Sequence, residues 1–143
     1  MAVFGLAEMQ ELLGKVFAPW VQDLAIQPVV VTENCVRFRL PENPRLVRTG
    51  GDGPPVICGQ SVAAVADTAS VLALCAFNSR FRNCTTADMT THFMRPMMLG
   101  DVDVAIEALS NGRRMAVTRA EFRSSGSPKL AATAICSFAY LEE

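Results

Sequence analysis

The sequence contains only one histidine among 143 residues, and this scarcity excludes several kinds of active site. A metal centre needs a cluster of ligands that one histidine and scattered carboxylates do not supply. His92 also has no evident catalytic triad around it, so we interpret it as a partly exposed or simply hydrogen-bonded side chain. We therefore expect neither a metal nor another cofactor.

Paired cysteines are also missing, although the chain has five cysteines. Without a CxxC pair, the sequence indicates neither a zinc site nor a disulfide framework. Free thiols in a reducing, cytoplasmic compartment are the simpler interpretation. The five are Cys35, Cys58, Cys75, Cys84 and Cys136.

A large net charge and a long hydrophobic run are lacking as well. The formal charge is −1, which provides no basic surface for nucleic acid. Residues 1–17 do not show the basic start and apolar run of a signal peptide. The apolar run Val62–Phe77 is shorter than the roughly 20 residues of a membrane span and contains Asp67. We expect no nucleic-acid or membrane partner.

What is present predicts a single folded domain over residues 1–143. Half of the residues are hydrophobic, and the length is enough to bury a substantial core. Apolar spacings of three and four predict an amphipathic helix over residues 8–24, within an N-terminal helical segment 1–25 that Pro19 interrupts. Residues 29–40 read as one β-branched strand, and loop-forming residues follow it.

A central helix and an antiparallel meander are predicted for the rest of the chain. Residues 59–78 are rich in Ala and Leu and apolar all around the axis, so this helix should be buried on most sides. Asn111-Gly112 predicts a two-residue hairpin turn, and Ser124–Pro128 predicts another turn. The expected fold is α+β, with an antiparallel sheet wrapped around the long helix. Period-two patterns place its strands at 87–93, 102–109, 115–123 and 130–141.

Asp67 is the only charged residue between Cys58 and Asn78. Carboxylates on buried helices are unusual unless they are paired or functional. A structural role would need a cation such as Arg95 or Arg113 to reach it. The functional interpretation is favoured over the structural one.

The start of the same helix is a second candidate site. Backbone N–H groups at Gly59 and Gln60 would lack helical partners, and such an end can hold an anion or a developing oxyanion. Residues 60 and 67 share a helix face but lie about 10.5 Å apart along the axis. One carbonyl cannot touch both, but two antiparallel copies could bring one start beside the other Asp67. If both act on one atom, the protein is at least a dimer.

Apolar and thiol side chains leave two interpretations open. Cys58 could be a nucleophile, but no second histidine exists to activate it, so we interpret it as a small buried apolar residue. Several methionines and phenylalanines could form an adaptable acyl pocket or simply pack in the core. They are Met89, Met94, Met97, Met98, Phe77 and Phe93.

Three short motifs occur in a fixed order. They are Gly59 followed by Val65-Ala-Asp-Thr-Ala69, then Thr85–Pro96, then Gly100-Asp101 with Asn111-Gly-Arg-Arg-Met-Ala116. Over residues 50–141, their order and spacing resemble the hotdog-fold thioesterases, in particular the PaaI-like acyl-CoA thioesterases. The resemblance implies a hotdog fold, an acyl-CoA substrate, and a homodimer at minimum, with a homotetramer expected.

The resemblance also implies roles for residues. Asp67 would be the catalytic nucleophile or general base, and Thr86 would help to position the water. The backbone N–H of Gly59 or Gln60 would polarise the carbonyl of a substrate held mainly by the partner subunit. Asp52 falls near the expected thioester position. Arg113, Arg114 and Arg80 are candidates for phosphate contacts, the alternative being that they are solvated surface arginines.

One departure from the family pattern concerns the start of the helix. The usual His-Gly-Gly is Cys58-Gly59-Gln60 here. Gln60 could donate a hydrogen bond to the carbonyl or restrict the substrate. Two alternatives to a thioesterase follow: an acyl-CoA-binding hotdog protein without catalysis, and, less favoured, a hydroxyacyl dehydratase, whose histidine would be sought at Cys58.

Overall fold

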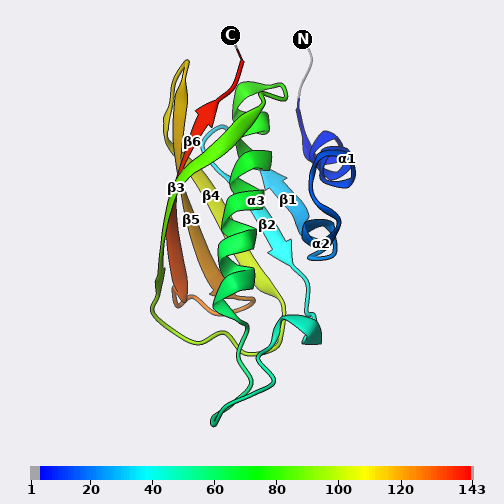
Figure 1. Cartoon of the computed structure of the whole chain (residues 1–143), viewed down its shortest axis with the longest axis vertical. Coiled ribbons are helices and arrows are strands. Elements are labelled where there is room, and N and C mark those ends of the chain that lie inside the picture. Colours follow the sequence, from blue (N-terminus) through cyan, green and yellow to red (C-terminus); the bar gives the residue numbers. More distant parts are fainter. Residues whose placement is uncertain (1–3, 143) are drawn as a thin grey trace.

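In the computed structural model, which describes residues 4–142, a six-stranded antiparallel sheet curves around one long helix, α3 (Gly59–Asn78) (Figure 1). The strand order is β1-β2-β4-β5-β6-β3. This arrangement confirms the predicted α+β fold with a sheet wrapped around a helix. The strands are β1 (Gln27–Val31), β2 (Val36–Leu40), β3 (Cys84–Phe93), β4 (Val102–Asn111), β5 (Met115–Ser124) and β6 (Ala132–Tyr140).

The prediction of one strand over residues 29–40 is wrong, because this segment is a hairpin of β1 and β2. Thr32 and Cys35 close its turn: the Thr32 N–H donates to the Cys35 carbonyl at 2.8 Å, and the Cys35 N–H donates to Thr32 Oγ1 at 3.1 Å. β-branched residues occur on both sides of the turn, so the composition predicts one continuous strand where the structure has two. The polar residues Glu33 and Asn34 were the signal for the break.

The hairpin between β4 and β5 exists, but its predicted turn is wrong. Asn111 still belongs to β4, and the Gly112 N–H donates to the Met115 carbonyl at 2.9 Å, so Arg113 and Arg114 form the tip. A register shift between Ala108 and Ser110 accompanies this displacement. The turn predicted at Ser124–Pro128 is confirmed.

In that turn the Ser127 N–H donates to the Ser124 carbonyl at 2.9 Å, and Gly126 has a φ of +85°. A glycine adopts this left-handed conformation without the steric cost that a Cβ would bring. The adjoining strands differ slightly from the predicted ones: β6 begins at Ala132, and β3 begins earlier than expected, at Cys84.

Two short helices form the N-terminal segment, α1 (Leu6–Val16) and α2 (Pro19–Gln22). Pro19 opens α2, since a proline is tolerated in the first turn but interrupts a helix that precedes it. Met9 and Leu13 are the buried residues of α1, which packs against β1 and α3.

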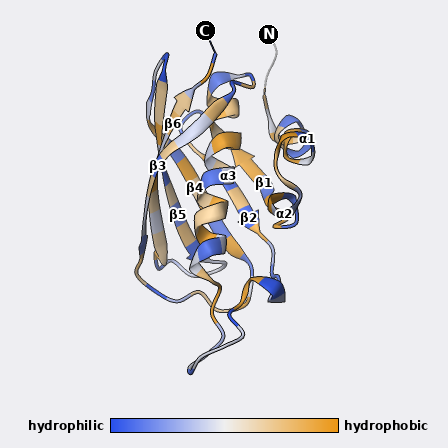
Figure 2. Ribbon diagram, viewed as in Figure 1, coloured by the Kyte–Doolittle hydropathy of each residue, from blue (hydrophilic) through white to orange (hydrophobic). Residues whose placement is uncertain are grey.

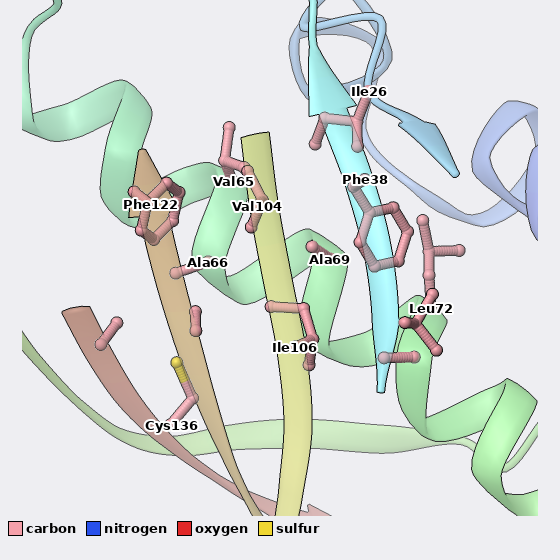
Figure 3. Packing of buried hydrophobic residues seen from close by; sticks show 14 of the residues in the cluster. Ile26, Phe38, Val65, Ala66, Ala69, Leu72, Val104, Ile106, Phe122 and Cys136 are labelled. Atoms are coloured by element: carbon pink, nitrogen blue, oxygen red, sulfur yellow. The ribbon is translucent and has the colours of Figure 1, made fainter. Parts of the chain in front are cut away.

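Helix α3 is the centre of the core. Eleven of its 20 residues are buried, and the facing strands β4, β5 and β6 alternate buried and partly exposed positions over most of their length. Figure 2 shows the hydropathy of the same elements. Burying each large apolar side chain contributes about 1.5–3 kcal/mol. The residues that meet between helix and sheet include Val65, Ala66, Ala69, Leu72, Phe38, Val104, Ile106 and Phe122 (Figure 3).

By length and composition alone, α3 could also span a membrane. Its apolar window is 61% buried inside the fold, however, which is the placement of a core helix. At its C-terminus Ser79 adopts a left-handed conformation with φ 55°, and its N–H donates to the Ala76 carbonyl.

One side of α3 is only partly covered by the rest of the chain. Gln60, Ala63, Ala64, Asp67 and Val71 follow one another at helical spacing and are exposed or only partly buried. The nearby edge strand β3 is also largely exposed. The candidate site lies between this side of α3 and β3.

Candidate active site

Asp67 projects from the middle of α3 toward β3 and is partly buried. Thr86, near the start of β3, donates a hydrogen bond from Oγ1 to Asp67 Oδ1 at 2.6 Å. Among residues 4–142 no ion pair involves Asp67, so neither Arg95 nor Arg113 neutralises it. The carboxylate is therefore held by one hydroxyl and retains a second oxygen for other contacts.

Two thiols lie within the electrostatic influence of this carboxylate. Burial, and after it the charge of Asp67, raises the pKa of the Cys84 thiol and that of the Cys136 thiol. Both thiols are consequently held in their neutral form at neutral pH. They are therefore not thiolate nucleophiles. Asp67, in contrast, has a carboxylate oxygen that accepts no hydrogen bond among residues 4–142.

The start of α3 leaves backbone donors available. Cys58 is the N-cap residue and makes no side-chain capping bond; instead Ser61 Oγ donates to the Cys58 carbonyl at 2.8 Å. Within the described chain, the N–H groups of Gly59 and Gln60 have no hydrogen-bond acceptor. The Gln60 side chain is exposed beside them.

Gly59 lies directly against Phe93, the last residue of β3. A Cβ at position 59 would be 3.3 Å from Phe93 Cζ, which is tighter than ordinary van der Waals contact. A hollow of about 370 Å³ opens here, and Arg48, Val62 and Arg95 line it with Gly59 and Phe93. Glycine therefore lets the Phe93 ring, and any ligand beside it, come close to the helix start.

Asp67 and Gly59 are not brought together within one copy. They are eight positions apart on α3, which corresponds to about 12 Å along the axis. Asp67 is paired with the Thr86 end of β3, whereas Gly59 contacts the Phe93 end. One chain thus carries two candidate half-sites at opposite ends of the same strand.

The other predicted pocket residues are more dispersed. Met89 lies on β3 between the half-sites and packs against the core. Phe77 is partly buried near the C-terminus of α3, about 15 Å along the axis from Asp67. Asp52 is exposed in the loop before α3, between Gly51 and Gly53, and Cys58 is partly buried at the helix start.

The predicted phosphate contacts gather at the far end of the molecule. Arg113 and Arg114 line a hollow of about 760 Å³ together with Arg80 and Arg82. Two of the four arginines are already engaged: Arg80 pairs with Glu142 at 3.1 Å, and the Arg82 guanidinium lies 3.5 Å from the centre of the Tyr140 ring. The hairpin tip, with Arg113 and Arg114, supplies the cations that have no ion pair among the described residues.

His92 lies on the other face of the sheet. Its neighbour Phe93 pairs with buried Ala132, so His92 points to the outer face, away from α3. A hydroxyacyl dehydratase needs a histidine beside the acidic residue, and this placement does not support that alternative. No group of three His, Cys, Asp or Glu that could hold a metal occurs within residues 4–142.

The sequence reasoning missed several residues near the site. Arg48 lies in a loop without any motif, and Cys84 joins the Asp67 region only because β3 begins earlier than predicted. The contact between Gly59 and Phe93 joins residues far apart in the chain, so no local pattern could reveal it.

Comparison with known proteins adds a family and a set of similar structures. Residues 56–139 match the family model described as the acyl-CoA thioesterase N-terminal domain. No curated protein sequence matches the chain. Three solved structures show the same fold.

A thioesterase from Haemophilus influenzae is 21% identical, with a TM-score of 0.82 over 99% of this chain and 94% of its own. A candidate thioesterase from a Silicibacter species is 24% identical, with a TM-score of 0.83 over 99% and 95%. A conserved protein from Pseudomonas aeruginosa is 25% identical, with a TM-score of 0.76 over 90% and 98%.

Proposed function

Because the chain belongs to the acyl-CoA thioesterase family of hotdog proteins, we propose that it hydrolyses acyl-CoA thioesters with Asp67 as the catalytic carboxylate. The observation that carries the proposal is the 2.6 Å hydrogen bond from Thr86 to an Asp67 carboxylate that has no cation partner among residues 4–142. A structural carboxylate on this helix would instead be paired with a cation.

The chemistry follows from the two oxygens of Asp67. Thr86 donates to Oδ1 and fixes the carboxylate, which leaves Oδ2 free to accept a proton from water or to attack the thioester carbonyl. In the general-base route the water oxygen bonds to the acyl carbon, the C–S bond breaks, and the proton passes to the CoA thiolate. General-base catalysis of this kind contributes about 10²–10⁴-fold.

The oxyanion donors would come from a second copy. The free N–H groups of Gly59 and Gln60 lie at the start of α3, where Gly59 lines a hollow, too far along the helix to serve Asp67 of the same chain. Strand β3 is an edge strand, and pairing it with β3 of another copy would join the two sheets. We propose a homodimer at minimum, with two equivalent sites across the seam; a tetramer remains an expectation from the family.

The substrate would extend from this seam in two directions. We place the acyl group beside Met89, between α3 and β3, where apolar side chains are partly exposed. Arg113 and Arg114 are proposed to contact the phosphates of CoA. Their hollow lies beyond the C-terminus of α3, about 16 Å along the axis from Asp67, so an extended pantetheine arm would have to connect the two.

A panel of acyl-CoA substrates with detection of the released thiol tests the proposal. At least one substrate should be hydrolysed, and Asp67→Asn, which keeps the acceptor for Thr86, should lower kcat by about 100-fold or more. Asp103→Asn is the matched control, because this exposed carboxylate pairs with Arg39 at 3.4 Å outside the site. Absence of hydrolysis across the panel, or an unchanged rate in Asp67→Asn, would contradict the proposal.

The exposed side chain of Gln60 favours one second candidate, an acyl-CoA-binding protein without turnover. Gln60 stands at the helix start, where the family usually has a glycine, and could occupy the space of the reacting carbonyl. Calorimetric binding of acyl-CoA without thiol release would support this second function. Release of thiol by the wild-type protein excludes it.

A further inference from the structure

Strand β3 (Cys84–Phe93) has one long free edge. Nine of its ten residues pair on one side with β6, and the strand order within residues 4–142 places no strand on the other side. Because paired residues share a face, the register with β6 assigns its side chains to two faces. Asp88, Thr90 and His92 lie on the outer face, and Met89, Thr91 and Phe93 lie on the face toward α3.

We infer that β3 pairs with β3 of a second copy in the register centred on Thr90, so that Asp88 of each copy faces His92 of the other. The inference rests on the two-copy site proposed above and specifies how that site is assembled. The partner of the free edge is a second copy of this chain, and the Asp88–His92 pair sets the register between the two β3 strands.

The alternation of faces limits the possible registers. Residues directly opposite one another on antiparallel strands point to the same side of the sheet. A two-fold axis between two residues would place an outer side chain opposite an inner one, for example Met89 opposite Thr90. The two-fold axis must therefore lie midway between one residue and the same residue of the second copy, so that this residue faces its own copy.

The charges and polar groups then favour one centre. An axis at Asp88 would set two carboxylates directly opposite each other, which is destabilising. An axis at Met89 would place Asp88 opposite Thr90 and leave His92 without a carboxylate. An axis at Thr90 pairs threonine with threonine and brings the Asp88 carboxylate to the His92 imidazole on both sides, where an imidazole N–H can donate to it.

The same centre also aligns the two half-sites. The ladder with β6 skips one β3 residue between Thr86 and Asp88, which is a β-bulge. Because Ala87 is the extra residue, the register centred on Thr90 places Thr86 opposite Phe93 of the second copy. Thr86 holds Asp67, and Phe93 covers Gly59, so the carboxylate of one copy comes beside the helix start of the other.

Cysteine cross-linking of the full-length protein tests the register without reference to activity. Facing residues on paired strands have Cα atoms about 4.5–5.5 Å apart, within disulfide range. Thr90→Cys should therefore form a disulfide-linked dimer under mild oxidation, seen on a non-reducing gel. Met89→Cys, the matched comparison from the neighbouring register, and the wild-type chain with its five cysteines should remain uncross-linked.

A stronger cross-link in Met89→Cys, or none in Thr90→Cys, would overturn the register. Because the readout is covalent linkage, it stays separate from failure of the proposed hydrolysis. An enzyme that hydrolyses acyl-CoA but does not cross-link at position 90 refutes only the register. A cross-linked dimer without hydrolysis refutes only the activity.

A charge exchange tests the named pair. His92→Asp should raise the dissociation constant of the dimer by about tenfold or more, because it sets carboxylates opposite each other in two places. The double variant Asp88→His, His92→Asp should return the constant to within about threefold of wild type. Sedimentation measures both, and circular dichroism verifies folding. A double variant as weak as the single one would refute the pair.

Discussion

At the scale of single residues, the site depends on how one hydroxyl holds one carboxylate. Asp67 is visible in the sequence as an isolated charge on an apolar helix, but its partner is not. Thr86 is separated from it by 19 positions and by a turn, and only the family resemblance pointed to it. The structure adds the physical reason for a threonine there, a donor to Oδ1 at 2.6 Å.

Removing that donor should slow turnover more than it weakens binding. Thr86→Val keeps the shape and the strand preference of the side chain but leaves Oδ1 of Asp67 without its donor. Hydrogen bonds to charged groups contribute about 1.5–3 kcal/mol, so we expect kcat to fall by about 10-fold to 100-fold if the bond acts in the transition state. Steady-state kinetics on the best acyl-CoA substrate measures this.

Thr86→Ser serves as the matched control, because it keeps the hydroxyl and loses only a methyl group. Its kcat should stay within about threefold of wild type. If Thr86→Val raises KM and leaves kcat unchanged, Thr86 contributes to substrate binding and does not position the carboxylate.

At the scale of secondary-structure elements, the sequence was informative where one period extended over a whole element. The strands β4, β5 and β6 follow clear alternating patterns because one face of each is buried. Helix α3 is recognisable from its Ala-rich and Leu-rich composition, because most of its residues are buried. The hairpin of β1 and β2 is predicted as one strand, because β-branched residues lie on both sides of a short turn. The turn lies at Arg113 and Arg114 and not at the predicted Asn111-Gly112, because Asn111 still pairs with Ala116 after a register shift of one residue in the ladder.

One contact between elements is polar and fully buried, the hydrogen bond of 2.7 Å between Ser70 of α3 and Thr118 of β5. Thr118→Val keeps the volume but leaves the Ser70 hydroxyl without this partner. An unsatisfied buried group costs about 1–3 kcal/mol, so we expect the free energy of unfolding to fall by that amount. Urea unfolding at a fixed protein concentration measures it.

The double variant Ser70→Ala, Thr118→Val provides the control for this pair. Removing both hydroxyls leaves no orphaned group, so the double variant should be clearly more stable than the sum of the two single losses predicts. Strictly additive losses would show that the two hydroxyls do not depend on each other.

At the scale of the whole molecule, the proposed active site needs two copies of the chain. The long helix that fills the core also separates the Asp67 carboxylate from the proposed oxyanion donor at Gly59, because the two residues lie on it eight positions apart. The sequence alone could suggest this separation from helix geometry. It could not show that both half-sites lie along the free edge strand β3, since that depends on contacts of Thr86 with Asp67 and of Phe93 with Gly59.

Two inactive variants should therefore complement each other when their subunits mix. Gly59→Pro removes the N–H donor. Proline is compatible with this position because it is favoured at the first residue of a helix. The preceding residue, Cys58, also has the extended conformation that proline requires, with φ −69° and ψ 147°. Asp67→Asn removes the carboxylate. A heterodimer of the two retains one intact site, formed by Gly59 of the Asp67→Asn copy and Asp67 of the Gly59→Pro copy.

Equal amounts of the two variants, unfolded and refolded together, should recover about a quarter of wild-type activity, since half of the dimers are mixed and each has one working site of two. Thiol release by the mixture, compared with each variant refolded alone, measures the recovery. Gly59→Ala is the control: it adds a Cβ beside Phe93 but keeps the N–H, so it should retain more activity than Gly59→Pro. Two variants that are each inactive but show no gain on mixing would mean that Asp67 and Gly59 do not act across the seam.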